Sequence, residues 1–179
     1  MPVIIKETGA GISAEDTKKL RSAGAACIDV AGAGGTSWAA VEYHRARQRG
    51  DLPGQEVGRD LWDWGIPTVV SLVEVLQSAD LPVIASGGVR SGSDVAKALA
   101  LGADLAGFAL PILSPALRSS EEVKSKLQLI MRQLRTVMFL VGAGSIEMLK
   151  ASPLIVTGRT AEWLRTRSFN LEVYARRGG

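Results

Sequence analysis

Four short apolar runs, separated by helical patterns, constrain most strongly what this sequence can fold into. None of the four alternates strictly between apolar and polar residues, which is typical of strands that a parallel sheet buries on both faces. Because parallel neighbours are joined by a crossover connection, usually a helix, this order predicts an α/β fold with right-handed crossovers. The four runs are Val3–Lys6, Cys27–Ala31, Val83–Ser86 and Leu105–Leu110.

Helical patterns occupy most of the sequence between and after these runs. Ser13 is predicted to cap the first helix, which should end at Gly24, a residue suited to the left-handed conformation that follows a helix. Ser93 is the predicted cap of the helix that stops at Gly102. The polar, glycine-bearing segment 50–58 is predicted to be a loop, and a short turn should follow the fourth run. Further helices are predicted over residues 38–49, 67–78, 121–141, 145–151 and 160–166.

The strand count limits the architecture. A complete (β/α)8 barrel has eight strands in about 250 residues, whereas this chain has 179 residues and four predicted strands. The pattern therefore leaves two possibilities, a small open sheet or half of a barrel. In either case we expect a single domain over residues 1–179, with β/α units over 1–118 and additional helices over 119–179.

Composition and charge argue against several functions. The net charge of +3 is small, aromatic residues make up 5%, and the basic pair Arg176–Arg177 is predicted to be a solvated tail, so nucleic-acid binding is not expected. No uncharged apolar stretch reaches about 18 residues, so no segment should cross a membrane. The first residues are charged too soon for a signal peptide, and we expect a cytoplasmic protein. The single cysteine, Cys27, should be a small buried hydrophobe.

The residues after each predicted strand are candidates for chemistry, because parallel α/β proteins bind ligands at the carboxyl ends of their strands. The strongest signal follows the third run. Gly87 and Gly88 would let backbone amides approach an anion, the next helix would add partial positive charge, and Arg90 could bind phosphate through two hydrogen bonds. The alternative is that both glycines serve only a tight turn. The loop after the fourth strand would lie beside this one, as in the phosphate site of β/α barrels.

Two other titratable side chains have contrasting predicted roles. Lys6 ends a buried strand, where a lysine is costly unless it reaches an anionic or electron-rich partner; the alternative is that it extends to solvent. His44 lies among charged residues on a predicted helix and is expected to be a solvated surface histidine. The sequence shows no metal-ligand motif and no nucleophile motif, so no metal site is predicted.

Six segments, in order along the chain, resemble the type 2 isopentenyl-diphosphate isomerases. The second segment is distinctive, the fourth is shared with several FMN barrels, and the set as a whole is specific. The resemblance implies the C-terminal half of a TIM (β/α)8 barrel, about four β/α units, with extra C-terminal helices. The segments are Val3–Glu7, Asp29–Trp38, Asp63–Thr68, Ser86–Gly92, Lys97–Asp104 and Ala109–Pro111.

Members of this family interconvert isopentenyl and dimethylallyl diphosphate with reduced FMN, with NAD(P)H as reductant and Mg²⁺ on the substrate diphosphate. By position, Lys6 would lie beside the N1 and C2 carbonyl region of the flavin and stabilise its reduced, anionic form, and Trp38 would lie near the substrate pocket. The proton shuttle is thought to involve the flavin itself, so the resemblance assigns no general base. Some relatives have a hydroxyl residue where Ala31 stands. The residues implied to bind FMN are Lys6, Ala31, Thr36, Gly87, Gly88, Arg90, Ala109 and Leu110.

The family is about twice as long as this chain. Its first four strands, with the residues for the substrate diphosphate and Mg²⁺, have no counterpart here, so we expect a missing N-terminal half or a homo-oligomer. Two alternatives to the FMN-binding half of an isomerase are open. One is another FMN barrel, such as a 2-hydroxy-acid oxidase, although the loop 32–38 lacks the histidine and arginine that such enzymes use. The other is a non-catalytic half-barrel that a partner or a second copy covers.

Overall fold

The computed structural model describes residues 1–178 and contains a parallel four-stranded sheet. The strands are β1 (Ile4–Lys6), β2 (Cys27–Asp29), β3 (Val83–Ala85) and β4 (Leu105–Ala106). They lie side by side in sequence order, and every neighbouring pair is parallel. This confirms the α/β fold and the strand order predicted from the apolar runs. Each strand is shorter than its run, and β4 is the shortest of the four.

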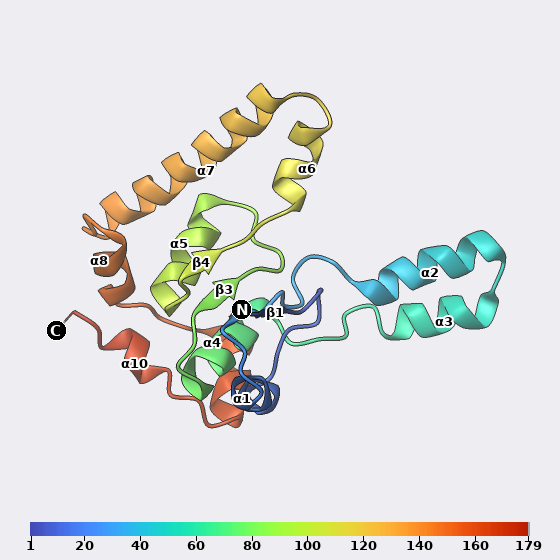
Figure 1. Ribbon diagram of the computed structural model, residues 1–179, viewed down its shortest axis with the longest axis horizontal. Helices are drawn as coiled ribbons and strands as arrows, with labels where there is room; N and C mark the ends of the chain where they lie inside the picture. Colours follow the sequence, from blue (N-terminus) through green and yellow to red (C-terminus); the bar gives the residue numbers. More distant parts are fainter. Residues whose placement is uncertain (179) are drawn as a thin grey trace.

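Helices connect the strands and continue after the last one (Figure 1). α1 packs beside α4, α7 lies across α5, and α2 with α3 forms a hairpin that projects away from the sheet (Figure 1). The helix bounds are α1 (Ala14–Ser22), α2 (Trp38–Arg49), α3 (Leu52–Asp60), α4 (Thr68–Ser78), α5 (Gly92–Leu101), α6 (Leu110–Ala116), α7 (Ser120–Leu140), α8 (Ile146–Ala151), α9 (Gly158–Thr166) and α10 (Glu172–Ala175).

One face of the sheet is covered by helices and the other face is open. Side chains alternate between the two faces of a strand. Ile28 and Val83 are paired neighbours on the covered face and are fully buried in the main apolar cluster. On the opposite face Ile4 and Leu105 are 57% and 61% exposed. Cys27 is paired with Ile4 on that face and is half-buried, so the prediction of a buried cysteine was wrong.

The open apolar face identifies the architecture. In a closed β/α barrel the corresponding side chains fill the interior, and every strand has two neighbours. Here β1 and β4 each have one neighbour within the described residues. The sheet is therefore half of a (β/α)8 barrel, with its inner face uncovered.

The α2–α3 hairpin includes a segment for which the sequence prediction was wrong. Residues 50–58 were predicted to be a loop, but most of them lie in α3, whose N-cap Asp51 accepts a hydrogen bond from the Gly54 amide at 3.0 Å. Gly58 permits close helix packing, because a Cβ at this position would lie 2.8 Å from the Ala39 carbonyl oxygen on α2. The helix is therefore stabilised by its contact with α2, which overrides the low helix propensity of glycine.

The N-terminus of α5 also differs from the prediction. Ser91 is the N-cap, and not Ser93. Ser91 Oγ accepts a hydrogen bond from the Asp94 amide at 3.3 Å, and Asp94 Oδ2 accepts one from the Ser91 amide at 3.0 Å. This reciprocal pair is a capping box, and the acidic residue three positions after Ser91 was its sequence signal.

Replacing Asp94 with alanine should destabilise the fold by about 1–2 kcal/mol at neutral pH, because the capping box is lost. Partial burial raises the pKa of Asp94, but hydrogen bonds from Ser91 and the Arg90 amide, with the charge of Lys97, outweigh it and hold the pKa below its usual value of 3.8. The stabilisation is therefore complete above pH 3.8 and is lost as the pH falls through the folded-state pKa.

Urea unfolding of wild type and Asp94→Ala, at pH 7 and again well below pH 3.8, measures this effect. The difference in unfolding free energy should narrow at the lower pH. Asp80→Ala, at an exposed carboxylate between α4 and β3, is the matched control. A difference that is equal at both pH values would contradict the role of the ionised Asp94.

The C-terminal part of the chain contains more helix than predicted. α6 replaces the expected turn after residue 110, and α10 was not predicted. Leu164 of α9 and Tyr174 of α10 are 0% and 3% exposed in the main apolar cluster. The burial of Tyr174 brings the end of the chain back onto α5, where the Arg177 guanidinium donates to the Ala100 carbonyl oxygen and lies over the Tyr174 ring. The prediction of a solvated tail was therefore wrong for Arg177. Among the helices of residues 1–178, none is both long and apolar enough to cross a membrane.

Candidate functional site

A cleft of about 770 Å³ lies at the carboxyl ends of the four strands. Residues from the loops after β1, β2, β3 and β4 all line it, as parallel topology leads one to expect. The cleft also brings together every residue that the family resemblance implied for FMN: Lys6, Ala31, Thr36, Gly87, Gly88, Arg90, Ala109 and Leu110.

Lys6, Asp29 and Ser86 form a charged network on the wall of this cleft. The Lys6 Nζ lies 2.6 Å from Asp29 Oδ2 and 3.2 Å from Ser86 Oγ. Ser86 Oγ in turn donates to Asp29 Oδ1 at 2.5 Å. The pairing of β1 with β2 sets Lys6 directly opposite Asp29. Asp29 is 7% exposed, whereas the Lys6 side chain is 55% exposed, so the ammonium group is accessible from the cleft.

The paired glycines of the third loop serve a close approach between two loops. Gly87 and Gly88 have φ angles of +97° and +79°, which L side chains rarely adopt. A Cβ at Gly87 would collide with the Gly32 carbonyl oxygen, and one at Gly88 with that of Gly34. The loop after β3 is therefore packed on the glycine-rich loop after β2. Both glycines would be required for this contact whether or not an anion binds.

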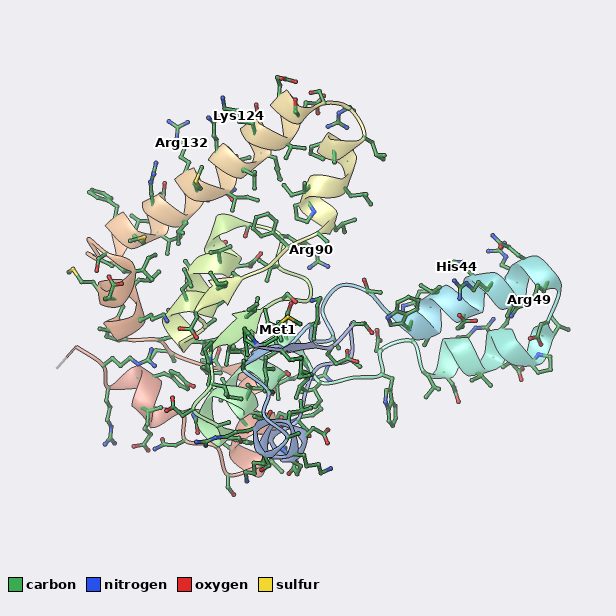
Figure 2. All side chains as sticks on the ribbon, in the orientation of Figure 1. Met1, His44, Arg49, Arg90, Lys124 and Arg132 are labelled. Carbon is green, nitrogen blue, oxygen red and sulfur yellow. The ribbon has the colours of Figure 1, made fainter. Side chains whose placement is uncertain are left out.

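Arg90 joins two loops at the edge of the cleft. Its Nη2 donates to the Gly34 carbonyl oxygen at 2.9 Å, and its Nη1 donates to that of Gly88 at 3.2 Å. The guanidinium therefore ties the second and third loops together at the rim of the cleft, where Figure 2 labels it. These contacts use two of the five N–H groups of the guanidinium, so the binding of a phosphate by Arg90 stays a prediction.

At the N-terminus of α5, side chains accept hydrogen bonds from three backbone amides. Asp94 Oδ2 accepts hydrogen bonds from the Arg90 and Ser91 amides, and Gln133 Oε1 of α7 accepts one from the Gly92 amide at 2.8 Å. The Asp94 carboxylate therefore lies beside the partial positive charge of this helix N-terminus. Anion binding in the cleft would depend as well on the glycine turn and on the start of α6, where Leu110 is the first helical residue.

Glu7 fixes the loop that follows Lys6. Its Oε2 accepts hydrogen bonds from the amides of Thr8, Gly9 and Ala10 at 2.7, 2.7 and 2.5 Å. Partial burial raises the pKa of Glu7, but these backbone hydrogen bonds outweigh it and hold the pKa below the usual value of 4.5. Glu7 is therefore ionised at neutral pH, and it is a second carboxylate among the residues that line the cleft.

Ala31 and Thr36 line the cleft from the loop after β2. Ala31 is 5% exposed and has a φ of +34°, an uncommon conformation for a residue with a side chain. Thr36 is exposed, and the Thr36 carbonyl oxygen would lie 2.6 Å from a Cβ at Gly9. The loops after β1 and β2 are therefore also in close contact.

Trp38 lies outside this cleft. Its Nε1 donates to the carbonyl oxygen and to the Oγ1 of Thr8, both at 3.1 Å. The indole, which is 52% exposed, lines a separate apolar groove along the α2–α3 hairpin together with Val57, Leu61 and Trp64. The structure therefore places Trp38 behind the loop that carries Thr8, on the side of the projecting hairpin.

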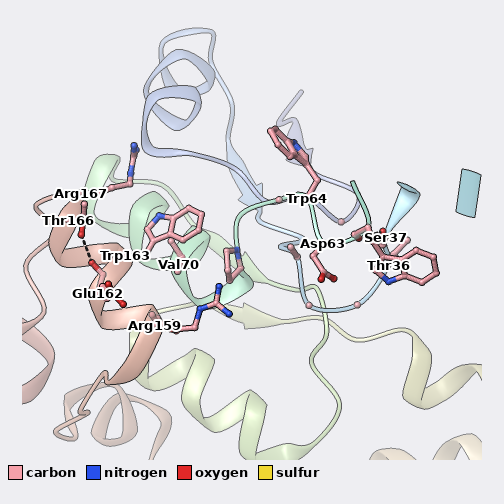
Figure 3. Close-up of a pocket in the computed structure, with 18 residues that line it drawn as sticks. Thr36, Ser37, Asp63, Trp64, Val70, Arg159, Glu162, Trp163, Thr166 and Arg167 are labelled. Atoms are coloured by element: carbon pink, nitrogen blue, oxygen red, sulfur yellow. Dashed lines mark hydrogen bonds between the residues drawn. The ribbon is translucent and has the colours of Figure 1, made fainter. Parts of the chain in front are cut away.

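A further cleft of about 970 Å³ lies between α9 and the loops that surround residues 33–37 and 62–67 (Figure 3). Arg159 and Trp163 of α9 line one side, and Asp63 and Trp64 line the other (Figure 3). Thr36 belongs to the lining of this cleft and of the strand-end cleft. The loop after β2 therefore separates the two.

The sequence prediction assigned no role to Asp29, Ser86 or Glu7. Each of the three is a polar residue at or directly after the end of a strand, as Lys6 is. The criterion that selected Lys6 could therefore have selected them too. The strand register, which brings Asp29 opposite Lys6, could not be read from the chain itself. Within residues 1–178 no group of three or more His, Cys, Asp or Glu side chains is arranged to hold a metal ion.

The fold and the cleft define a class: β/α-barrel proteins that bind their ligand at the carboxyl ends of the strands. The chain belongs to the FMN-dependent dehydrogenase family, whose family model matches residues 1–156.

Curated relatives confirm the resemblance to isopentenyl-diphosphate isomerases. The isopentenyl-diphosphate delta-isomerase of Methanothermobacter thermautotrophicus is 53% identical over 99% of this chain and 49% of its own length. The enzyme of the same name from Thermococcus onnurineus is 49% identical over 98% of this chain and 46% of its own. The chain thus spans about half the length of the curated relatives it matches.

Solved structures agree with the half-barrel. A lactate oxidase from Pediococcus acidilactici superposes with a TM-score of 0.62 at 31% identity, over 88% of this chain and 37% of that one. A mandelate oxidase superposes with a TM-score of 0.59 at 25% identity, over 84% of this chain and 38% of that one.

Proposed function

We propose that this chain is the FMN-binding half of an enzyme that isomerises isopentenyl diphosphate to dimethylallyl diphosphate. The observation that carries the proposal is the strand-end cleft, where Lys6, the Gly87–Gly88 turn and the start of α6 meet. Sequence identities of 53% and 49% to two named isomerases, along nearly the whole chain, support the choice of reaction.

The cleft has the size and the polar groups that FMN requires. Its volume of about 770 Å³ falls within the usual range of roughly 300–1,000 Å³ for small-molecule sites. The glycine turn exposes backbone where a Cβ would otherwise stand. At the start of α6 the Leu110 amide precedes the first hydrogen bond of the helix, in which the Ile112 amide donates to the Ala109 carbonyl oxygen. We assign the phosphate to this end, with Gly87, Gly88, Arg90, Ala109 and Leu110. The Arg90 side chain also holds the turn against the loop after β2.

Lys6 is assigned to the flavin ring. When bound and reduced, FMN supplies an electron-rich ring for the proton transfers of the isomerisation. An ammonium group on the cleft wall favours the anionic ring over the neutral one, because only the anion gains a charge interaction. Ala31 and Thr36 complete this wall from the loop after β2. NAD(P)H is the proposed reductant.

The remaining functions are assigned to the absent half. The substrate diphosphate and its Mg²⁺ would bind to an N-terminal half, which would cover the open face that carries Ile4 and Leu105. Self-association of two copies is the second way to cover this face. α9 and α10 share the main apolar cluster with the sheet, which supports one domain from the strands through the C-terminal helices. A cytoplasmic location remains part of the proposal.

The position of His44 favours an isomerase over a 2-hydroxy-acid oxidase. His44 is the one histidine of the sequence, and an oxidase would need such a base beside the flavin. It lies on α2 in the projecting hairpin (Figure 2). There its ring makes edge contacts with Tyr43 at 5.3 Å and Trp62 at 5.9 Å. Trp38 is still proposed to lie near the substrate pocket.

Lys6→Ala should weaken the binding of reduced FMN more than that of oxidised FMN. Because the Lys6 side chain is 55% exposed, solvent screens its charge, and we expect about a tenfold difference between the two redox states, or about 1.4 kcal/mol. Anaerobic titration with dithionite-reduced flavin and aerobic titration with oxidised flavin measure the two affinities.

Lys18→Ala is the matched control, because Lys18 is exposed on α1 and carries the same charge. It should leave the ratio of the two affinities unchanged. An equal loss of both affinities in Lys6→Ala would remove the role of Lys6, and a wild-type chain that binds neither form would refute the proposed function.

A further inference from the structure

Asp29 is a buried carboxylate on the cleft wall for which the proposed function has no role. It ends β2 and is 7% exposed. Each of its carboxylate oxygens has its own partner: Oδ2 accepts from the Lys6 ammonium at 2.6 Å, and Oδ1 accepts from the Ser86 hydroxyl at 2.5 Å. The carboxylate of β2 therefore contacts the end of β1 and the residue that follows β3.

A neutral side chain would be enough to anchor Lys6. An asparagine has nearly the same shape as an aspartate and offers a carbonyl oxygen to the ammonium group. What the carboxylate adds is a full negative charge within ion-pair distance of Lys6. Burying this charge is unfavourable unless it is paired and hydrogen-bonded. A carboxylate at this position therefore has an electrostatic effect that anchoring does not require.

We propose that Asp29 is a positioning residue that sets the redox preference of the cleft for flavin. It holds the Lys6 ammonium on the cleft wall and offsets much of its positive charge. The cleft then stabilises the anionic, reduced flavin less than an unpaired lysine would. The inference rests on the proposed function, because it needs FMN beside Lys6. Ser86 keeps the carboxylate in the orientation that faces the ammonium.

The sign of the expected effect distinguishes this role from a structural one. Asp29→Asn removes a negative charge beside an anionic ligand, so it should raise the ratio of reduced to oxidised FMN affinity by about fivefold or more. Lys6→Ala changes the same ratio in the opposite direction. A general loss of structure would weaken both redox states together and leave the ratio unchanged.

Two further variants test whether Asp29 acts through Lys6. Ser86→Ala removes two hydrogen bonds from the same network without a change of charge. Because it loosens the carboxylate that faces Lys6, it should change the ratio in the same direction as Asp29→Asn, but by less. In the double variant Lys6→Ala with Asp29→Asn, the effect of Asp29→Asn should be smaller than in wild type, because the two residues are in direct contact. An undiminished effect would show that Asp29 does not act through Lys6, and would overturn the positioning role.

A measurement on the flavin-free wild-type chain needs no folded variant. The Lys6 side chain is 55% exposed, but its ion pair with Asp29 should slow its reaction with an amine-acylating reagent. We expect a rate about fivefold lower than that of the exposed Lys18, because an ion pair worth about 1 kcal/mol corresponds to a factor of about five. Peptide mass spectrometry after brief labelling gives both rates. Equal rates would show that Asp29 does not hold Lys6 and would overturn the inference.

The outcomes separate this inference from the proposed function. If the wild-type chain binds FMN and Asp29→Asn leaves the ratio of affinities unchanged or lowers it, the role of Asp29 is refuted while the proposed function stands. If the wild-type chain binds neither redox state, the proposed function is refuted, and the role of Asp29 toward flavin is refuted with it. A raised ratio, together with slow acylation of Lys6, supports both.

Discussion

Supplying the missing half of the barrel should tighten FMN binding by about a hundredfold or more. In this chain the cleft has walls from four loops, and the inner face of the sheet is open beside it, with Leu105 61% exposed. Covering roughly 100–150 Å² of apolar flavin surface, at about 25 cal/mol per Å², is worth about 2.5–4 kcal/mol, or roughly a hundredfold or more in affinity. The chain alone should therefore bind FMN weakly.

Flavin fluorescence titration of the chain alone, and of the chain coexpressed with an N-terminal half, measures this difference. The N-terminal half of the Methanothermobacter thermautotrophicus relative is a suitable partner, because that protein is 53% identical to this chain along the shared region. Conversion of isopentenyl diphosphate should appear only when both halves, FMN, a reductant and Mg²⁺ are present. The N-terminal half by itself is the control. Nanomolar FMN affinity for the chain alone would contradict the prediction.

The sequence predicted the strands well because their signal is local. Each apolar run has a glycine, a proline or a charged residue directly beside at least one end, and the run length is that of a buried strand. The same reasoning failed for α3. Its glycine-bearing segment forms a helix because Gly58 allows close contact with Ala39 of α2, and a contact between two elements is not visible in either element alone.

The candidate site was predictable in its location but not in its internal contacts. Parallel topology requires the four loops to meet, so Lys6, Gly88 and Leu110 could be assigned to one cleft before the structure was known. The partners of these residues depend on register and loop packing. That is why Asp29 was missed, and why the sequence did not show that Arg90 also joins two loops through their carbonyl oxygens.

Gly88→Ala should destabilise the fold by roughly 2–5 kcal/mol and abolish FMN binding. The backbone at Gly88 has a φ of +79°, which costs an alanine about 1–2 kcal/mol. The new Cβ would also collide with the Gly34 carbonyl oxygen, and overpacking of this kind costs about 1–3 kcal/mol. To relieve the collision, the loops after β2 and β3 must separate, which would move Arg90 away from one of its two carbonyl partners.

Gly142 separates the two contributions. It has a φ of +72°, close to that of Gly88, but a Cβ built there meets nothing within 4 Å. Gly142→Ala therefore carries the backbone cost alone, about 1–2 kcal/mol, and it should leave FMN affinity unchanged because the residue follows α7, outside the cleft lining. Urea unfolding and flavin titration of both variants give the comparison. If the two variants lose equal stability, or if Gly88→Ala binds FMN as wild type does, the prediction is contradicted. Gly88 would then be needed only for its backbone conformation, and not for the contact between the loops after β2 and β3.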